Sequence, residues 1–365
     1  MADLAFVESP VQLLNVLEWS HARVLPAVLP AVPAQRGASG TAPRGPALTV
    51  VVLSPTDPMS RGQLRRMAQL AREEGIEVCW QEARGGRGSL PRTVRRLAPL
   101  LRAADRVVIG DPYSRYVQLL LGLFAPPLGP RELTVVDDGT ATMEFTAGLA
   151  RGERLVRWHR RGSRSPRELL LAPVSALARR RLVPSGRRGV EVFTALPVRA
   201  PEGVTVTRNQ FAWTRARFGP PRLTRGADLV GTSLVETGVV DPGPYVAAVG
   251  ALARAHGATR YFAHRREGVE KLHRIAVETG LEIVRPDLPL ELIARRGPIG
   301  RTVLSFPSTV VHTLPLALAG TGVTIAVCEI APQWLRAGAS PRAQGFLAGV
   351  SGTAARDVHR LPIPV

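Results

Sequence analysis

Apolar and polar positions alternate along the first third of the chain in a way that predicts strands followed by helices. Residues 48–53 are almost continuously apolar, as expected of a strand covered on both faces of a parallel sheet. Residues 4–7 predict a first strand. Ser9, Pro10 and Gln12 then form the pattern of a helix start, with serine as N-cap, proline in the first helical position and glutamine closing a capping box.

Further elements follow from the same patterns. We expect helices to about residue 22 and at 57–75, 90–104 and 113–124, strands at 76–80, 106–111 and 133–138, and a loop at 28–47. Strands that alternate with helices predict an open, mostly parallel sheet.

The middle of the chain, residues 145–222, breaks this rhythm. Short hydrophobic pieces are scattered there among arginines, prolines and glycines, and Pro220-Pro221 closes the region. The alternation then returns, with strands expected at 228–231, 260–264, 282–285, 302–306 and 323–328, and helices at 241–256, 269–279 and 308–319. We therefore expect an α/β protein of two Rossmann-like domains that face each other across a cleft: residues 1–222, with an irregular Arg-rich region at 145–222, and residues 223–365.

Length and composition narrow the class of protein. A chain of 365 residues that is 45% hydrophobic can bury two separate cores. Its two cysteines, Cys79 and Cys328, exclude a disulfide framework and a zinc-finger array. Asp3 and Glu8 stand where an export signal would be basic, and no run of about 18 apolar residues occurs. These features predict a cytoplasmic protein without a membrane-spanning helix.

The charge is strongly positive and unevenly distributed. The chain has 48 Lys+Arg against 29 Asp+Glu, a net charge of +19, and Lys271 is its only lysine, which indicates a compositional bias toward arginine. Residues 151–190 alone contain twelve arginines, enough to create a potential of several kT. This stretch is either a solvated basic surface or a docking face for an anionic membrane, an acidic glycan or nucleic acid.

A pair of acidic residues is the first candidate for chemistry. Asp137 and Asp138 directly follow the strand expected at 133–138, and Gly139 permits an unusual backbone turn after them. Ligands of open α/β sheets bind outside the carboxyl ends of the strands, so one carboxylate could serve there as a general base on a hydroxyl. The alternative is an ordinary Asp-Asp-Gly turn.

The second half of the chain offers candidates for holding phosphate and ribose. His264 ends a strand with Arg265 and Arg266 behind it, which forms a plausible phosphate clamp. Ser308 and Thr309 lie where a strand gives way to a helix, and free N–H groups and the helix dipole favour phosphate there.

Glu291 could accept hydrogen bonds from the two ribose hydroxyls. Purely structural roles are possible for all of these residues: a core histidine, an N-cap, or a glutamate that favours the helix dipole. Together, a base in the first domain and a phosphate and ribose set in the second favour a nucleotide-sugar glycosyltransferase.

Several other function classes lack their usual motifs. No G-x-x-x-x-G-K-[ST] sequence is present, and no G-x-G-x-x-G follows the first strand, which argues against ATP hydrolysis and dinucleotide reduction. A G-x-S-x-G nucleophile elbow is also missing. The seven histidines show no paired spacing for metal ligands, and no nucleic-acid module is recognisable. Nucleic acid is therefore not an expected partner.

Five segments, in their order and spacing, resemble the bacterial sialyltransferases and polysialyltransferases. They are Phe6–Asn15 (FVESPVQLLN), Asp137–Gly139, Gly231–Glu236 (GTSLVE), His264–Glu267 (HRRE) and Ser308-Thr309. The resemblance covers nearly the whole chain and implies a GT-B fold with a nucleotide-sugar cleft. It also implies an inverting, metal-independent transfer of sialic acid, or a related nonulosonic acid, from a CMP-activated donor to a glycan hydroxyl, without a cofactor.

The resemblance also assigns roles to individual residues. Asp138 is the first choice for the general base and Asp137 the second. His264 binds the donor phosphate and assists the departure of CMP, the Ser308-Thr309 pair holds the same phosphate, and Glu291 binds the cytidine ribose. Many members of the group have proline after the histidine, whereas this chain has Arg265.

Two alternatives stay open at this point. One is an enzyme of the same fold that uses another nucleotide sugar, a hexosyltransferase or an epimerase. The other is a non-catalytic protein that binds acidic glycan or membrane through the arginines of 151–190. In the favoured interpretation, the partners are a CMP-activated sugar, a glycan acceptor and, through those arginines, an anionic membrane at its inner face or an acidic polysaccharide.

Overall fold

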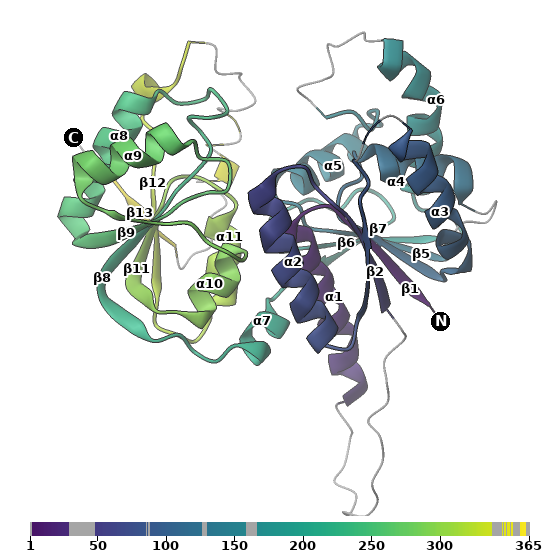
Figure 1. The fold of residues 1–365 in the computed structure, drawn as a ribbon, viewed down its shortest axis with the longest axis horizontal. Helices are drawn as coiled ribbons and strands as arrows, with labels where there is room; N and C mark the ends of the chain where they lie inside the picture. The colour runs from purple at the N-terminus through teal and green to yellow at the C-terminus, as the bar shows by residue number, and fades with distance from the viewer. Residues whose placement is uncertain are drawn as a thin grey trace, which may run out of the picture. The chain divides into compact units, whose positions relative to one another are not determined.

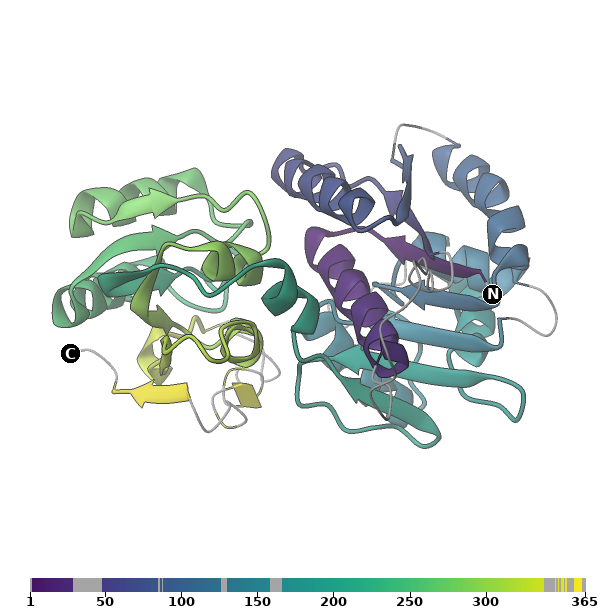
Figure 2. The ribbon, with the colours of Figure 1, turned by 90° about the horizontal axis from the view of Figure 1, so that it is seen from below.

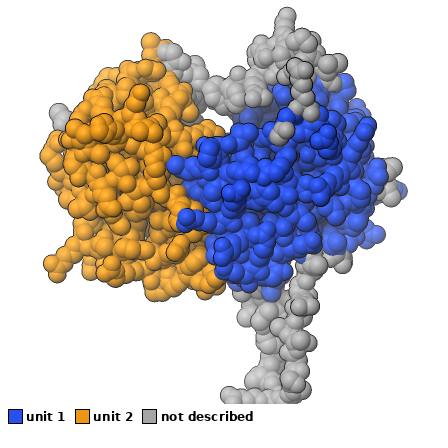
Figure 3. All heavy atoms as spheres, viewed as in Figure 1, with its two compact units in different colours: residues 1–209 blue, residues 210–365 orange. Residues whose placement is uncertain are grey.

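A computed structural model of the chain describes residues 2–28, 48–84, 86, 88–125, 130–157, 166–337, 345, 347, 349–350, 352 and 358–362. The loop expected at 28–47 therefore lies, except for its first residue, outside the described part. The chain divides into two compact units, residues 1–209 and residues 210–365, which we call unit 1 and unit 2 (Figure 3).

Among its described residues, unit 1 is built on a seven-stranded parallel sheet with the order β3-β2-β1-β4-β5-β6-β7 (Figure 1). Its strands are β1 (Asp3–Val7), β2 (Leu48–Leu53), β3 (Glu77–Gln81), β4 (Arg106–Ile109), β5 (Glu132–Val136), β6 (Gly189–Thr194) and β7 (Val204–Arg208). The apolar run that predicted β2 is buried at five of its six positions, because helices cover both faces of the sheet.

The helices of unit 1 lie on both faces of this sheet. They are α1 (Pro10–Val28), α2 (Pro58–Glu73), α3 (Ser89–Ala103), α4 (Arg115–Leu119), the π-helix η1 (Leu120–Phe124), α5 (Thr140–Ala150) and α6 (Pro166–Arg181). Helices α1 and α2 pack together on one face, while α3, α4, η1 and α6 share the other (Figure 1). On that second face, Leu97, Leu120 and Leu182 pack into one core with Val107 and Val135 of the strands.

The predicted start of α1 is confirmed, with one difference of detail. The Gln12 N–H donates to Ser9 Oγ at 3.2 Å, and Gln12 Oε1 accepts from the N–H of Glu8 at 2.7 Å, not from that of Ser9. Gln12 also fills the space beside Gly110, where a Cβ would stand 2.4 Å from the glutamine side chain. The helix start is thus fitted closely against the end of β4.

The region 145–222 is not irregular, in contrast to the sequence-based expectation. It contains α6, β6, β7 and α7 (Ala212–Arg217), and the two strands complete the sheet of unit 1. Two features conceal this order in the sequence. Pro173 lies inside α6, and β7 lies at the edge of the sheet, where its threonines and arginine need no apolar cover.

Unit 2 repeats the strand order of unit 1. In the described part of this unit, six parallel strands lie in the order β10-β9-β8-β11-β12-β13, which corresponds to the first six strands of the unit 1 sheet, β3-β2-β1-β4-β5-β6. The strands are β8 (Leu223–Val230), β9 (Ala258–Phe262), β10 (Glu282–Val284), β11 (Ile299–Ser305), β12 (Thr324–Cys328) and β13 (Val358–Leu361). This is the doubly wound order of nucleotide-binding sheets.

The helices of unit 2 also cover both faces of their sheet (Figure 2). Besides α7, the unit has α8 (Pro242–His256), α9 (Val269–Thr279), α10 (Leu290–Arg296), α11 (Val310–Ala317) and the 3₁₀ turn η3 (Pro332–Trp334). Leu229 packs in the core under α8 and α9, whereas its neighbour Val230 packs under α10 and α11. Adjacent residues of a strand point to opposite faces, so both faces of β8 are apolar.

The sequence predicted a boundary between the units at 222/223, but in the structure it falls at 209/210. Asn209 belongs to unit 1, because its Nδ2 donates to Oδ1 of Asn15 at 2.8 Å. The helix α7 that follows belongs to unit 2, where it packs against α10 and α11. Its Arg215 donates from Nη1 to the carbonyl oxygen of Leu316 at 3.0 Å.

Across the described ranges, we find no helix that is both long enough and apolar enough to span a bilayer.

Candidate functional site

The strand order places a switch point in each sheet where the direction of winding reverses. In unit 1 it lies between β1 and β4, and in unit 2 between β8 and β11. Ligands of such sheets bind outside the carboxyl ends of the strands at this point. The sequence-predicted residues follow strands at or next to these positions: the acidic pair follows β5, His264 follows β9, and Ser308 follows β11.

The first of the two acidic residues in unit 1 is locked inside the fold. Asp137 is 3% exposed, its Oδ2 accepts from Thr194 Oγ1, and its Oδ1 accepts from the N–H of Gly139, both at 2.8 Å. Burial raises the pKa of its carboxyl from 3.8 to about 6, although these hydrogen bonds act in the opposite direction. Gly139 has φ +67° and ψ −130°, a conformation that suits glycine and lets the chain double back beneath the carboxylate.

The second acidic residue, Asp138, reaches the edge of the sheet. Its side chain is 14% exposed, and its Oδ1 accepts from Ser9 Oγ at 3.3 Å. Its backbone N–H donates to Thr142 Oγ1 at 2.8 Å, which fixes the start of α5. The Ser9 hydroxyl thus makes two hydrogen bonds: it accepts from the N–H of Gln12 as the cap of α1, and it donates to Asp138. Of the pair, Asp138 is the residue that a substrate could reach.

Arg157 lies beside Asp138, a position that the sequence did not indicate. Its Nη2 donates to Oδ2 of Asp111 at 2.7 Å and lies 3.9 Å from Oδ2 of Asp138. Its guanidinium stands 5.5 Å from the centre of the Tyr113 ring. This arginine was counted in the basic stretch 151–190, yet the fold uses it to balance two carboxylates. The signal that could have found Asp111 is its position two residues after the end of β4.

Glu8 completes the acidic edge of unit 1. It follows β1, and its carboxylate accepts from the guanidinium of Arg84 and the hydroxyl of Ser114. Burial raises the pKa of Glu8. The edge therefore carries Glu8, Asp111 and Asp138, held in place by two arginines. The motif that includes Glu8 was recognised in the sequence, but this role for the side chain was not.

In unit 2, His264 is held by its backbone and its ring. Its N–H donates to Oε2 of Glu267 at 2.5 Å, and its Nδ1 accepts from the N–H of Arg266 at 3.2 Å. The neutral ring then carries its proton on Nε2, which makes that nitrogen a hydrogen-bond donor. Burial, together with the charges of Arg265 and Arg266, lowers the pKa of His264 from 6.5 to about 4.

Glu267 anchors a buried polar network behind His264 that the sequence did not reveal. Its Oε1 lies 2.6 Å from Lys271 Nζ and accepts from Tyr261 Oη at 2.6 Å. Lys271 also donates to the carbonyl oxygen of Thr232, at 3.0 Å, in the turn after β8. A Cβ at Gly231 would stand 2.1 Å from Glu267 Oε2, so this turn has room for glycine alone. The network ties the ends of β8 and β9 together.

The structure brings three of the predicted donor-binding residues together at α11. Glu291 is buried in α10, and its Oε1 accepts from Thr313 Oγ1 at 2.6 Å. Thr313 lies one helical turn after Thr309, so Glu291 stands beside the first turn of α11. Ser308 Oγ lies 3.5 Å from Ser305 Oγ at the end of β11. Burial raises the pKa of Glu291.

His264 and Arg265 lie on the same edge of the unit 2 sheet but further along it. They follow β9, which is separated from β11 by β8 alone. No hydrogen bond joins His264 to Ser308 or Glu291 among the described residues, so a ligand that spans β8 would be needed to contact all three. The described residues contain no group of three or more His, Cys, Asp or Glu that could hold a metal ion.

We compared the chain with known protein families, sequences and solved structures. No protein-family profile matches the chain, and no curated protein sequence does. Among solved structures, the chain is similar to an α/β-galactoside α-2,3-sialyltransferase from Photobacterium phosphoreum, with 9% identity, a TM-score of 0.50 and coverage of 98% of both chains. It is also similar to a putative UDP-N-acetylglucosamine 2-epimerase from Listeria monocytogenes (11% identity, TM-score 0.49, 89% of this chain and 78% of that chain). A third is the GT-B domain of a Photobacterium damselae sialyltransferase (11% identity, TM-score 0.41, 99% and 100%).

The likeness to the first of these structures extends over nearly the whole of both chains. Together with two doubly wound parallel sheets, it shows that this chain has an α/β, two-domain GT-B fold, as the sequence predicted. A fold hosts many chemistries, so what the chain does has to be argued from its site.

Proposed function

We propose that this chain is a glycosyltransferase that moves sialic acid, or a related nonulosonic acid, from a CMP-activated donor to a glycan hydroxyl with inversion of configuration. The observation that carries the proposal is the division of labour within one acidic pair. Asp137 is buried and fully hydrogen-bonded, whereas Asp138 is partly exposed at the carboxyl edge of the sheet. One carboxylate holds the turn, and the other is available to a substrate.

In the proposed reaction, Asp138 is the general base. The acceptor hydroxyl gives its proton to the Asp138 carboxylate while its oxygen attacks the anomeric carbon of the sugar. The bond from that carbon to the phosphate oxygen breaks, and its electron pair leaves with CMP. Inversion follows because the acceptor attacks from the face opposite the leaving group.

The proposed donor-binding residues would stabilise the charge that grows on the departing phosphate. His264 offers Nε2–H, Arg265 adds positive charge, and Ser308 and Thr309 offer hydroxyls at the positive end of the α11 dipole. The low pKa of His264 keeps it neutral while no donor is bound. Its Nδ1 is engaged by the N–H of Arg266, so His264 would act on the departing phosphate as a neutral hydrogen-bond donor through Nε2–H.

Glu291 is proposed to bind the ribose. One oxygen of its carboxylate accepts from Thr313, and a carboxylate has further lone pairs that can accept from ribose hydroxyls. The choice of CMP over other nucleotides, and the role of each donor-binding residue, are supported by the resemblance to sialyltransferases in the five sequence segments. The proposal requires no cofactor, since a single phosphate can be balanced by these protein donors.

Nucleotide binding and donor cleavage test the proposal. Thermal unfolding of the purified chain with CMP, UDP or GDP should show selective stabilisation by CMP, and incubation with CMP-sialic acid should release CMP. Selective stabilisation by UDP or GDP would instead assign the site to another nucleotide sugar. A chain that binds no nucleotide at all, but binds acidic glycan or anionic membrane, would contradict the enzymatic function altogether.

A further inference from the structure

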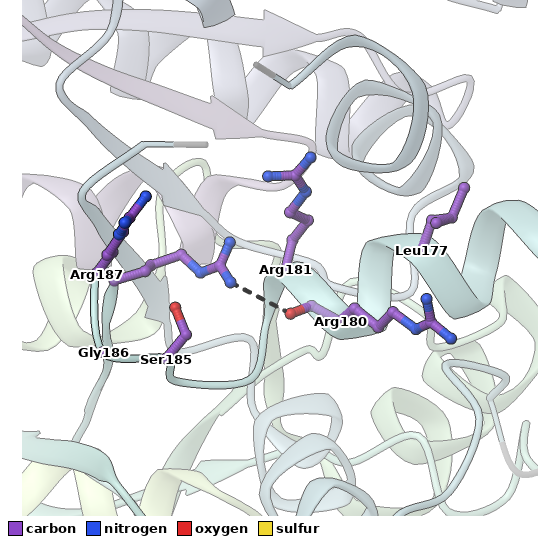
Figure 4. Close-up of a pocket in the computed structure, with 7 residues that line it drawn as sticks. Leu177, Arg180, Arg181, Ser185, Gly186 and Arg187 are labelled. Atoms are coloured by element: carbon purple, nitrogen blue, oxygen red, sulfur yellow. Dashed lines mark hydrogen bonds between the residues drawn. The ribbon is translucent and has the colours of Figure 1, made fainter. Parts of the chain in front are cut away.

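A second charged feature of unit 1 lies at the edge of the sheet opposite the acidic pair. Strands β5 and β6 are parallel neighbours, so α6 must return the chain from the carboxyl edge of the sheet to its amino edge. The last turn of α6 and residues 182–188 therefore lie near the start of β6. A hollow of about 560 Å³ opens there, and it is lined by Leu177, Arg180, Arg181, Ser185, Gly186, Arg187 and Arg188 (Figure 4).

The charge of this hollow is entirely positive. Four of its lining residues are arginines and none is acidic. Arg180 and Arg187 are exposed, and neither pairs with a carboxylate in the part of the chain that the structure describes. Arg188 Nη2 donates to the carbonyl oxygen of Arg180 at 3.4 Å, which anchors one side of the hollow to the end of α6 (Figure 4).

Arg188 also has a donor that its surroundings leave unused. Its Nε is buried and has no acceptor among the described residues. Burial lowers the pKa of Arg188, and the nearby charge of Arg181 lowers it further. A buried donor without an acceptor is costly, and so is repulsion between neighbouring guanidinium groups. An anion in the hollow would relieve the repulsion.

The positive surface continues along α6. An adjoining hollow of about 320 Å³ is lined by Gly152, Arg154, Ala172, Ser175, Ala176, Arg179 and Arg180, again without an acidic residue. Arg180 belongs to both hollows.

We propose that the hollow formed by Arg180, Arg181, Arg187 and Arg188 binds a phosphate group of a ligand distinct from the sugar donor. The guanidinium group of arginine matches the geometry of phosphate oxygens. A phosphate dianion also balances the positive charge of more than one guanidinium group, which a single carboxylate does not. The site lies at the edge of the sheet opposite Asp138, so it is separate from the proposed reaction. The phosphate can come from a lipid headgroup or from a soluble phosphate compound.

Binding of inorganic phosphate to matched variants tests the site. Phosphorus NMR titration at physiological ionic strength should show binding to the wild-type chain and binding roughly tenfold weaker or more for Arg180→Gln/Arg187→Gln. Both side chains are exposed, so this variant should keep the wild-type circular dichroism spectrum and Tm. The control, Arg225→Gln/Arg301→Gln, removes the same charge from exposed positions of unit 2 and should bind phosphate like the wild type. Equal weakening in both variants would reduce the effect to general charge attraction and overturn the proposal.

Vesicles separate the two sources of phosphate. Phosphatidylcholine vesicles that contain phosphatidic acid should sediment with the wild-type chain and release it on addition of inorganic phosphate if the source is a lipid. Binding of inorganic phosphate without binding to these vesicles would support a soluble source. Hyaluronate, a carboxylate polymer, provides the opposing test. If the chain binds it tightly and added phosphate does not reduce that binding, the proposal would be overturned in favour of an acidic glycan. Release of CMP from the donor should be unchanged in Arg180→Gln/Arg187→Gln, so this test is independent of the proposed function.

Discussion

The two units share a strand order, but the carboxyl edges of their sheets carry opposite chemistry. In unit 1 the edge displays the carboxylates Glu8, Asp111 and Asp138, which arginines hold in place. In unit 2 the carboxylate Glu267 is turned inward onto the backbone of His264, and the edge displays neutral donors and arginine. The shared topology thus gives each unit an equivalent binding position at the carboxyl edge of its sheet. The side chains at that edge decide whether it attracts a proton or an anion.

A second contrast lies in how each edge is fixed. Arg157, which holds Asp111, is one-third exposed, whereas Lys271, which holds Glu267, is 6% exposed. Ion pairs at the surface contribute little to stability, while removal of one partner from a buried pair leaves an uncompensated charge. The unit 2 edge should therefore be rigid and sensitive to substitution, and the unit 1 edge more tolerant.

The largest expected effect is on catalysis at the unit 1 edge. Asp138→Asn removes the proton acceptor and should lower the rate of transfer from CMP-sialic acid by about 10²–10⁴-fold, the range of general base catalysis. The Tm should change little, because Asp138 is partly exposed. Asp241→Asn, at a carboxylate 47% exposed in unit 2, is the control and should leave the rate unchanged. Full activity of Asp138→Asn would remove Asp138 from the mechanism.

At the unit 2 edge, the largest expected effect is on stability. Glu267→Gln leaves Lys271 without its closest counter-charge and should lower the free energy of unfolding by about 3–5 kcal/mol in urea titrations. Glu278→Gln is the matched control, because it breaks an exposed ion pair with Arg274 on α9 that has the same four-residue spacing. It should lower the free energy of unfolding by no more than about 0.5 kcal/mol. Glu267→Gln/Lys271→Met should be more stable than Glu267→Gln alone. Equal costs for the two single variants would contradict the conclusion that the buried pair at the unit 2 edge is sensitive to substitution.

Asp137 in unit 1 and His264 in unit 2 should also make stability respond to pH in opposite directions. The pKa of Asp137 is raised from 3.8 to about 6 in the folded chain, so its contribution to stability is complete below pH 3.8 and is lost as pH rises through 6. The pKa of His264 is lowered from 6.5 to about 4, so its contribution is complete above pH 6.5 and is lost as pH falls through 4. In the wild type the two contributions partly cancel between these values.

Single variants would separate these contributions. Relative to wild type, Asp137→Asn should make stability rise more steeply between pH 4 and 6, by up to about 3 kcal/mol, and His264→Gln should make it rise less. Calorimetry across this range measures both slopes. Variants with slopes equal to that of the wild type would show that neither group titrates as its burial implies.

The smallest expected effect concerns Ser9, which joins the helix start to the acidic edge. Ser9→Ala should cost about 1 kcal/mol of stability as a lost N-cap and should also lower the transfer rate several-fold, because Asp138 loses a contact. Asp57→Ala removes the cap of α2, which lies away from the acidic pair, and should match the loss of stability without the loss of rate. Equal rates in the two variants would mean that Ser9 does not position Asp138.

Much of the fold was predictable because the signals are local. An apolar run predicts β2, a cap and a proline predict the start of α1, and the same reasoning located most strands of unit 2. The acidic pair was found because it directly follows a strand of a parallel sheet. Each of these inferences depends on residues within a few positions of one another, which the sequence displays directly.

The remaining features depend on partners that are distant in the chain. Arg157 meets Asp111 across 46 residues, and the sequence alone counted it as one of twelve arginines in a basic stretch. Strands β6 and β7 and the end of unit 1 at Asn209 escaped prediction because pairing and packing, not apolar alternation, define them.

The sequence by itself thus determined the α/β class, the two sheets and the position of the acidic pair. Only the tertiary structure decided which aspartate of that pair is exposed, because burial depends on Thr194 and Asn15 from other parts of the chain. It also decided which charges of the basic stretch are balanced and which line an open hollow, because neutralisation requires that a carboxylate be brought within a few ångströms.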